Sequence, residues 1–225
     1  MTPLDTPAVY VFSFRENINT LTQHLAAIPS GSLAVIGKGT EEQKALCHKR
    51  GVTLLCLLEK EEYLKQNGVE TAQGVLAELI QRTDTVLEDL TVLVMGYGNC
   101  GSAIASLLWL CGCEVFVHAR QKGLSKAEQD GFNLFYANGD PAPFDVIINT
   151  VPGDVFPDEF LDRISPDTMI FQVASGLSGR EIGDFLRRGL FFLPLPGLPG
   201  RFSPQTEAEL IGDLIARELQ RKRET

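Results

Sequence analysis

The sequence lacks several features on which whole classes of proteins depend. No apolar stretch approaches the ~18–20 residues that span a bilayer. The first 15 residues lack the basic start and apolar core of a signal peptide. We therefore expect a cytoplasmic protein. The five cysteines form an odd set, so we expect reduced thiols rather than a disulfide framework.

Motifs for metal binding and hydrolysis are also missing. The three histidines form no H-x-x-x-H pair, there is no C-x-x-C pair, and no G-x-S-x-G occurs. We expect neither a metal site nor a serine hydrolase. The run Gly37-Lys38-Gly39-Thr40 lacks the earlier glycine of a phosphate loop, and Gly39 stands where Ser or Thr would hold magnesium.

Positive charge is scarce. The chain has 20 Lys and Arg residues against 29 Asp and Glu residues, a net charge of -9. Without a basic stripe, it is a poor candidate for binding nucleic acid or an anionic membrane. The basic cluster at 221–223 is expected to be a frayed helix end. Any anionic ligand must then be held by a few local Arg or Lys residues.

Strand-length apolar runs alternate with segments of helical period along most of the chain. This alternation is typical of βαβ units and predicts an α/β fold with mainly parallel strands. Strands are expected at 8–12, 33–36, 52–57, 91–95, 114–118, 132–136, 145–149, 168–173 and 190–193. Helices are expected at 18–28, 41–49, 59–65, 71–87, 99–110 and 205–221, with others between most later strands.

The pattern predicts two domains. Residues 1–88 form a smaller N-terminal α/β domain, a substrate or lid domain that ends in a linking helix. Residues 89–203 form a NAD(P)-binding domain with a Rossmann-type doubly wound parallel sheet, and residues 204–225 form a C-terminal helix that packs back across both. No flexible linker marks the boundary near residue 88, so closely packed domains are expected. The chain is a possible homo-oligomer.

The run Gly96-Tyr97-Gly98-Asn99-Cys100-Gly101 matches G-x-G-x-x-G. It follows a buried strand and opens a helix, the context of a dinucleotide fingerprint. Gly96 permits the tight turn, Gly98 leaves room for a pyrophosphate, and Gly101 lets helix and strand pack closely. The helix N-terminus attracts phosphate. All six residues are expected to contribute to the cofactor site, although a helix N-terminus could instead lower the pKa of Cys100.

The next strand is followed by Ala119-Arg120-Gln121-Lys122. NAD-binding versions of the fold place an acidic residue there for the ribose hydroxyls. Ala119, Arg120 and Lys122 are therefore expected to lie beside the cofactor, with the guanidinium on a 2′-phosphate, which favours NADP over NAD. The alternative is a solvated basic turn. His118 is expected near the adenine.

Later strand ends should face the same cofactor, because ligands of such sheets bind at the carboxyl ends of strands. Thr150, Val151, Pro152 and Ser175 are expected to line the nicotinamide end. The proline- and glycine-rich run at 194–201 is either a fixed loop over the nicotinamide or a stiff crossover into the last helix.

From about residue 70 onward, roughly two thirds of the chain, the sequence resembles the A subunit of dipicolinate synthase, an enzyme of sporulating bacteria. The resembling segments are 71–74, 94–98, 119–120, 147–152, 173–175 and, most specifically, Pro196-Gly197-Leu198-Pro199-Gly200 with Pro204 and Thr206 downstream. The region before the linking helix is shorter than in that family. Gln172 stands where the family usually has Asp, and residues 176–180 depart from its turn.

The resemblance implies an NADP-dependent oxidoreductase that oxidises dihydrodipicolinate to dipicolinate, with the B subunit of dipicolinate synthase as a partner. A dicarboxylate substrate needs cationic partners. Arg201 and Arg180 are the candidates, with Lys38 a weaker one, and the catalytic residues are unknown. Two other functions stay open. One is a non-catalytic NADP(H)-binding subunit or sensor, and the other is an oxidoreductase acting on another small cyclic imine or acid.

Overall fold

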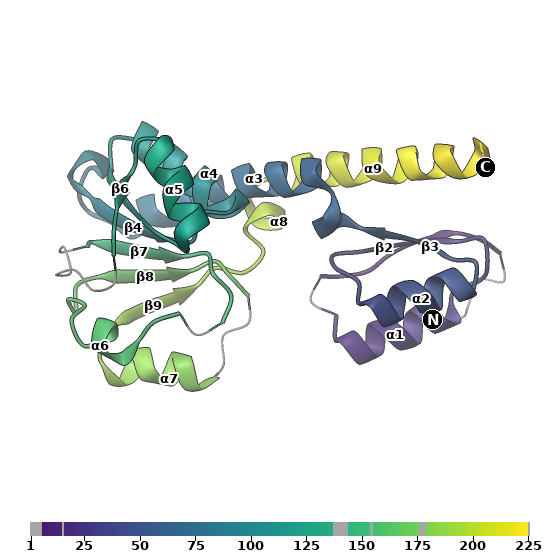
Figure 1. Cartoon of the computed structure of the whole chain (residues 1–225), viewed down its shortest axis with the longest axis horizontal. Coiled ribbons are helices and arrows are strands. Elements are labelled where there is room, and N and C mark those ends of the chain that lie inside the picture. The colour runs from purple at the N-terminus through teal and green to yellow at the C-terminus, as the bar shows by residue number, and fades with distance from the viewer. Residues whose placement is uncertain (1–5, 15, 137–143, 154, 176–178, 225) are drawn as a thin grey trace. The chain divides into compact units, whose positions relative to one another are not determined.

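The computed structural model describes residues 6–14, 16–136, 144–153, 155–175 and 179–224, with the backbone alone at 179–181. The chain divides into two compact units (Figure 1). Unit 1 comprises residues 1–66 and 205–225, and unit 2 comprises residues 67–204. The sequence-based boundary near residue 88 differs from this division, because most of the linking helix packs with unit 2.

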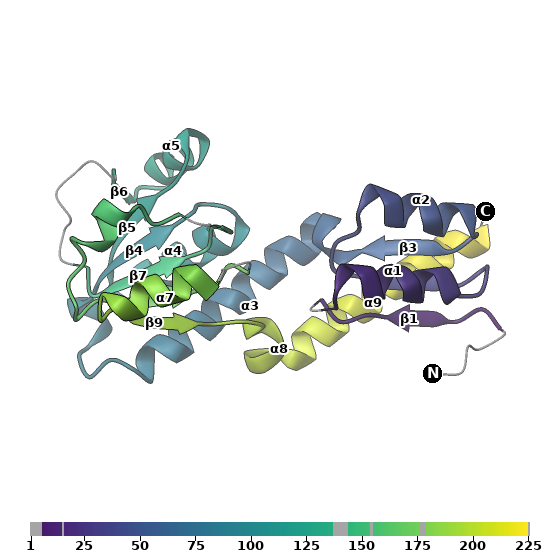
Figure 2. The ribbon, with the colours of Figure 1, turned by 90° about the horizontal axis from the view of Figure 1, so that it is seen from below.

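Unit 1 is built on a parallel sheet of three strands in the order β1-β2-β3. Its elements are β1 (Val9–Val11), α1 (Ile18–Ala27), β2 (Leu33–Ile36), α2 (Glu41–Lys49), β3 (Thr53–Cys56), the 3-10 turn η1 (Leu57–Glu59), the start of α3 (Glu61–Ile80), and α9 (Pro204–Glu224), which belongs to unit 1 from residue 205 onward. Helices α1 and α2 lie side by side over one face of the sheet (Figures 1 and 2).

Local sequence explains where these helices begin. Asn17 caps α1 by accepting a hydrogen bond from the Asn19 backbone N–H at 2.9 Å. Thr40 and Gln43 form a reciprocal capping box at the start of α2. Such caps satisfy N–H groups that have no partner within the helix and typically contribute ~1 kcal/mol each.

The other face of this sheet is covered by α9. Leu214 is buried among Leu33, Val35, Leu55 and Tyr63. The Tyr63 hydroxyl hydrogen-bonds Glu207 at 3.0 Å, and Arg217 pairs with Glu62 at 2.8 Å. The C-terminal helix is therefore an integral layer of unit 1.

Unit 2 is a doubly wound parallel sheet of six strands in the order β6-β5-β4-β7-β8-β9. Its elements are the rest of α3, η2 (Leu87–Asp89), β4 (Thr91–Met95), α4 (Asn99–Leu110), β5 (Glu114–His118), α5 (Gln121–Gln129), β6 (Asn133–Leu134), β7 (Val146–Asn149), α6 (Asp158–Leu161), β8 (Met169–Gln172), α7 (Gly179–Arg187), β9 (Phe191–Pro194) and α8 (Leu198–Phe202).

Alternate residues of each central strand enter opposite cores. Val92 and Val94 of β4 face the cluster formed with α3 and α4, whereas Leu93 and Met95 face the cluster formed with α6 and α7. Period-2 alternation between two buried faces gives the continuous apolar strands expected of a parallel sheet. The predicted α/β class with a doubly wound parallel sheet is confirmed.

Two elements differ from the sequence-based expectation. The helices predicted at 59–65 and 71–87 are one helix, α3, which ends at Ile80. Gly68 lies within this helix, and a Cβ there would be 2.8 Å from the Asn99 carbonyl oxygen, so the position must be small. A short helix, α8, begins within the run at 194–201 and follows Gly197, which has the left-handed conformation at φ 67°.

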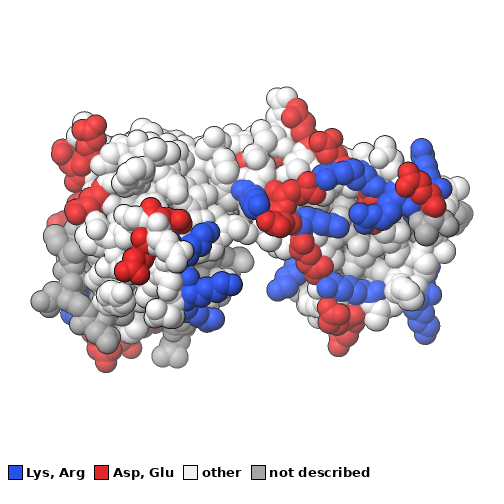
Figure 3. All heavy atoms as spheres, turned by 45° about the horizontal axis from the view of Figure 1, so that its top comes forward, with Lys and Arg blue, Asp and Glu red and all other residues white. Residues whose placement is uncertain are grey.

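Charges of both signs are interleaved on the face of unit 1 that carries α9 (Figure 3). Arg221 pairs with Glu218 at 3.3 Å, and the Lys222 ammonium donates to the Gly31 carbonyl oxygen. Within the described residues, no helix has the length and apolar character needed to cross a membrane.

Replacing Leu214 with Ala should destabilise unit 1 by about 2–5 kcal/mol, because the deletion leaves a cavity between α9 and the sheet. The matched change Leu110→Ala, at a leucine that is 73% exposed, should cost at most about 0.5 kcal/mol. Urea unfolding followed by far-UV circular dichroism checks both, since the single tryptophan, Trp109, reports on unit 2 alone. Equal losses would contradict the burial of Leu214.

Candidate cofactor site

The strand order of unit 2 reverses between β4 and β7, which are adjacent and parallel. In open α/β sheets, ligands bind in the crevice outside the carboxyl ends of the strands at such a reversal. The strands nearest to it end at Met95, His118, Asn149 and Gln172. The candidate site is therefore built from the turns that follow these four residues.

The turn after β4 has a geometry that only glycine permits at two positions. Gly96 has φ +93°, and its N–H donates to the His118 carbonyl oxygen at 2.7 Å. A side chain at Gly101 would place its Cβ 2.0 Å from the Gly96 carbonyl oxygen. The first turn of α4 thus packs directly against the turn that precedes it.

Gly98 is different, because an added Cβ would meet nothing within 4 Å. It is the N-cap of α4 and offers no side-chain cap to the first N–H groups of the helix. These N–H groups and the positive end of the helix dipole suit an anion. The open cradle at Gly98 fits the pyrophosphate of a dinucleotide.

Tyr97 contributes its backbone to this turn, while its side chain packs on unit 2. Its hydroxyl donates to Asp130 at 2.8 Å, and its ring meets Phe132 edge-on, with centroids 5.8 Å apart. Burial, together with the bond to Asp130, raises the pKa of Tyr97. The phenol therefore stays protonated at neutral pH and anchors the turn.

Cys100 faces α3. Burial raises the pKa of its thiol, and a hydrogen bond with Thr71 opposes that rise only in part. A helix N-terminus would lower a thiol pKa, whereas the pKa of Cys100 is raised, with desolvation as the largest cause. The sequence-based possibility of a reactive thiolate at Cys100 is not supported. The side chain instead joins the glycine turn to α3.

Arg120 and Lys122 lie exposed at the start of α5, directly after β5. No described residue bonds the Arg120 guanidinium or the Lys122 ammonium, and both side chains are exposed. Ala119 is half-buried beside Gly123. His118 Nδ1 lies 3.0 Å from the Phe135 carbonyl oxygen, which can only accept, so the proton lies on Nδ1.

The turn after β7 packs beneath the glycine turn. The hydroxyl of Thr150 donates to the Met95 carbonyl oxygen at 2.8 Å and lies where a side chain on Gly96 would otherwise sit. Val151 is half-buried, whereas Pro152 and Ser175 are exposed. The structure thus brings Thr150 and Val151 against the glycine turn.

Two residues that sequence reasoning did not place in the site are buried at its base. Asn149 and Gln172 end β7 and β8, and their side-chain amides meet at 2.9 Å. Asn149 also holds the backbone of Val151, and Gln172 donates to the Ala174 carbonyl oxygen. Each of these polar residues ends an otherwise apolar strand, and this sequence pattern could have identified both as site residues.

The substrate candidate Arg201 is already engaged within unit 2. Its guanidinium pairs with Glu78, a carboxylate that is 2% exposed and also pairs with Arg82. Lys38 is exposed in unit 1. Arg180 is the second residue of α7, and its side chain lies outside the described part of the chain.

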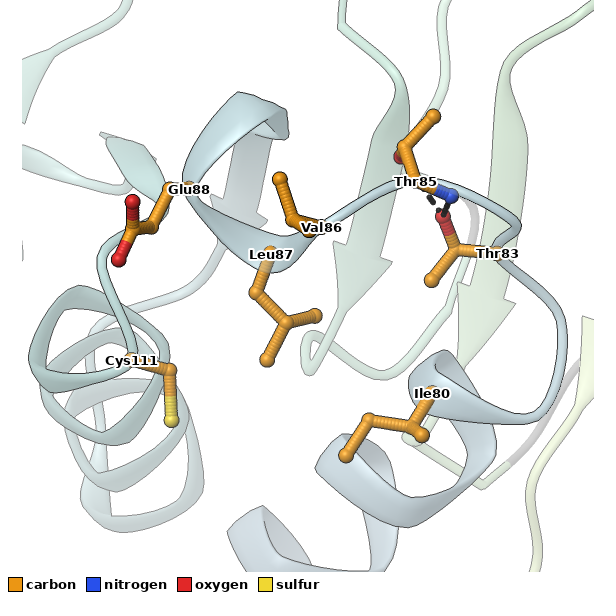
Figure 4. Close-up of a pocket in the computed structure, with 7 residues that line it drawn as sticks. All are labelled: Ile80, Thr83, Thr85, Val86, Leu87, Glu88 and Cys111. Atoms are coloured by element: carbon orange, nitrogen blue, oxygen red, sulfur yellow. Dashed lines mark hydrogen bonds between the residues drawn. The ribbon is translucent and has the colours of Figure 1, made fainter.

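A hollow of about 420 Å³ lies at the opposite edge of this sheet (Figure 4). Ile80, Leu87 and Cys111 point into it, with Thr83, Thr85, Val86 and Glu88 around them. Residues 87–89 and 111 precede the amino ends of β4 and β5, so the hollow is separate from the site at the carboxyl ends. Among the described residues, no group of three or more His, Cys, Asp or Glu is placed to hold a metal.

Comparisons with known proteins agree with this geometry. The family described as "Acetohydroxy acid isomeroreductase, NADPH-binding domain" matches residues 86–176. The chain is 26% identical to the A subunit of dipicolinate synthase from Bacillus subtilis (strain 168) over 213 residues, 93% of this chain and 71% of that protein. The predicted resemblance is confirmed. A further relative, the ketol-acid reductoisomerase (NADP(+)) of Pyrococcus abyssi, is 34% identical over 83 residues, 36% of this chain and 25% of that protein.

Solved structures extend the similarity to the fold. The dipicolinate synthase A chain from Bacillus subtilis superimposes with a TM-score of 0.78 at 25% identity, covering 91% of this chain and 70% of that one. Its counterpart from Bacillus halodurans gives a TM-score of 0.76 at 25% identity, covering 88% and 69%. The Rossmann-type fold is confirmed. These similarities support an oxidoreductase in general terms and a nicotinamide cofactor.

The two glycines should respond in opposite ways to alanine. Gly101→Ala forces the turn away from α4 and should destabilise the protein by several kcal/mol, on the order of other severe backbone clashes. Gly98→Ala has space for the methyl group and should cost about 1 kcal/mol or less, the difference between Gly and Ala at an N-cap. Thermal unfolding checks this contrast. Similar losses in the two variants would contradict the geometry of the turn.

Proposed function

We propose that this chain is an NADP-dependent oxidoreductase of the dipicolinate synthase A type that oxidises dihydrodipicolinate to dipicolinate. The observation that carries the proposal is the glycine turn at the strand-order reversal, open at Gly98 and followed along the sheet by the exposed cations Arg120 and Lys122. The similarity to the A subunit of dipicolinate synthase over 93% of the chain supports this reaction over others of the same fold.

The cofactor contacts follow from the order of the strand ends. The backbone of residues 96–101 holds the pyrophosphate, and Arg120 with Lys122 binds the 2′-phosphate beside Ala119. Thr150, Val151, Pro152 and Ser175 lie at the nicotinamide end. NADP+ held by these residues would supply the hydride acceptor for the dihydropyridine ring, and the accompanying proton would pass to solvent as the ring becomes aromatic.

The chain's own contribution is binding and orientation. Among the described residues of the turns after β4, β5, β7 and β8, none is Asp or Glu. His118 ends β5, and its Nδ1 is bonded to the Phe135 carbonyl oxygen. Because the aromatic product favours the reaction, the site requires accurate placement more than a strong base.

Substrate recognition needs positive charge for two carboxylates. Arg82, Arg201 and Glu78 together leave one positive charge in excess, and the Arg201 side chain is 50% exposed. We propose Arg201 as a substrate contact on this basis, with Arg180 and Lys38 as the other candidates. The relative is named as one subunit of dipicolinate synthase, which supports the B subunit of that enzyme as a partner.

The pairing of Arg201 with Glu78 also favours a second candidate function. If that ion pair is purely structural, the chain is an NADP(H)-binding subunit or sensor without substrate chemistry. The two functions can be distinguished by measurement. Either protein would bind NADPH, but only the oxidoreductase would form dipicolinate.

The purified chain, supplied with freshly made dihydrodipicolinate and NADP+, should form dipicolinate and NADPH in equal amounts, above the spontaneous rate. Ultraviolet absorbance of the product and of NADPH measures this. The reaction is repeated with the B subunit of dipicolinate synthase from Bacillus subtilis added. Tight NADPH binding with no dipicolinate in either reaction would reject the enzyme and leave the binding protein.

Replacing Arg120 with Ala should weaken NADPH binding by about 1.5–3 kcal/mol, the range for a hydrogen bond to a charged group. NADH binding should hardly change, because NADH has no 2′-phosphate. Titration followed by the fluorescence of the reduced nicotinamide checks both. Equal losses for the two cofactors would show that Arg120 does not contact the 2′-phosphate.

A further inference from the structure

Two buried side-chain amides join neighbouring strands at the base of the candidate site. Asn149 is 0% exposed and Gln172 is 3% exposed. They are paired directly across β7 and β8, and the Asn149 amide nitrogen donates to the Gln172 side-chain oxygen at 2.9 Å. Buried polar groups are costly unless they are bonded, so this pair needs its partners.

Within the described part of the chain, the other bonds of the pair go to the turns that follow. The Val151 backbone N–H donates to Asn149 Oδ1 at 2.9 Å, and Asn149 Nδ2 donates to the Val151 carbonyl oxygen at 3.1 Å. Gln172 Nε2 donates to the Ala174 carbonyl oxygen at 2.9 Å. The two amides therefore fix the turns at 150–152 and 173–175 relative to each other.

The direction of each bond requires an amide at both positions. The Ala174 carbonyl can only accept, so residue 172 must donate there while accepting from Asn149. An ionised carboxylate at 172 could accept from Asn149 but would place an oxygen against the Ala174 carbonyl oxygen. The pair is thus specific to neutral amides, beyond what simple packing requires.

We infer that Asn149 and Gln172 are positioning residues for the nicotinamide half of the cofactor. This inference rests on the proposed function. Under the proposed function, the N-terminus of α4 would hold the pyrophosphate and the residues after β5 would hold the 2′-phosphate, which leaves the side of β7 and β8 for the nicotinamide. The two amides position the nicotinamide through the turns that they hold, and they do not affect binding of the adenine half.

A cofactor fragment separates these two halves. Adenosine 2′,5′-bisphosphate carries the adenine and the 2′-phosphate but no nicotinamide. The variant Gln172→Glu should bind NADPH about tenfold more weakly, the effect of losing one buried hydrogen bond, and should bind the fragment as the unaltered protein does. NADPH fluorescence and calorimetry of the fragment measure the two affinities.

Three further variants make the result interpretable. Gln172→Met, close to glutamine in length and neutral, removes both bonds without adding charge and should show the same pattern, which covers a failure of the glutamate variant to fold. Gln81→Glu makes the same chemical change at an exposed site and should alter neither affinity. Arg120→Ala should weaken the fragment and NADPH alike.

The outcomes distinguish this inference from the function on which it rests. If the unaltered chain binds neither NADPH nor the fragment, the proposed function fails, and the positioning role falls with it. If it binds both, but the folded Gln172 variants lose both affinities equally or lose neither, the positioning role alone is overturned.

Discussion

The candidate cofactor site depends on one close contact, the approach of α4 to the turn that precedes it. With only 2.0 Å between a notional Cβ on Gly101 and the Gly96 carbonyl oxygen, no side chain fits at residue 101. Other elements also pack closely around this contact. The Thr150 hydroxyl occupies the space beside Gly96, and Gly68 of α3 leaves room for the Asn99 carbonyl oxygen. Three separate segments are therefore adapted to the position of one helix end.

Helix α3 extends this arrangement to the last part of unit 2. Thr71 bonds Cys100 on one side, while Gly74 allows Leu198 of α8 to approach to 2.8 Å of a notional Cβ. Glu78, which lies on the same helix as Thr71 and Gly74, pairs with Arg201. Helix α3 therefore contacts both the glycine turn and the run at 194–201, and these contacts determine where the two segments lie.

Sequence patterns predicted the features that depend on local rules. The glycine turn, its buried strand and the helix it opens are visible because each role demands a particular residue at a fixed spacing. Long-range contacts were not visible. Nothing near Gly68 in the sequence shows that Asn99 lies against it, so one helix was predicted as two. The bonds of Asn149 to Gln172 and of Glu78 to Arg201 likewise join residues brought together by the fold alone.

The polar groups of the candidate site differ in charge along the sheet, according to the part of the proposed cofactor that they face. Cations stand beside β5, and free N–H groups stand at α4, where the proposed cofactor is anionic. Beside β7 and β8 the buried polar groups are neutral amides. The glutamine at 172 donates as well as accepts, and so it holds both turns in place.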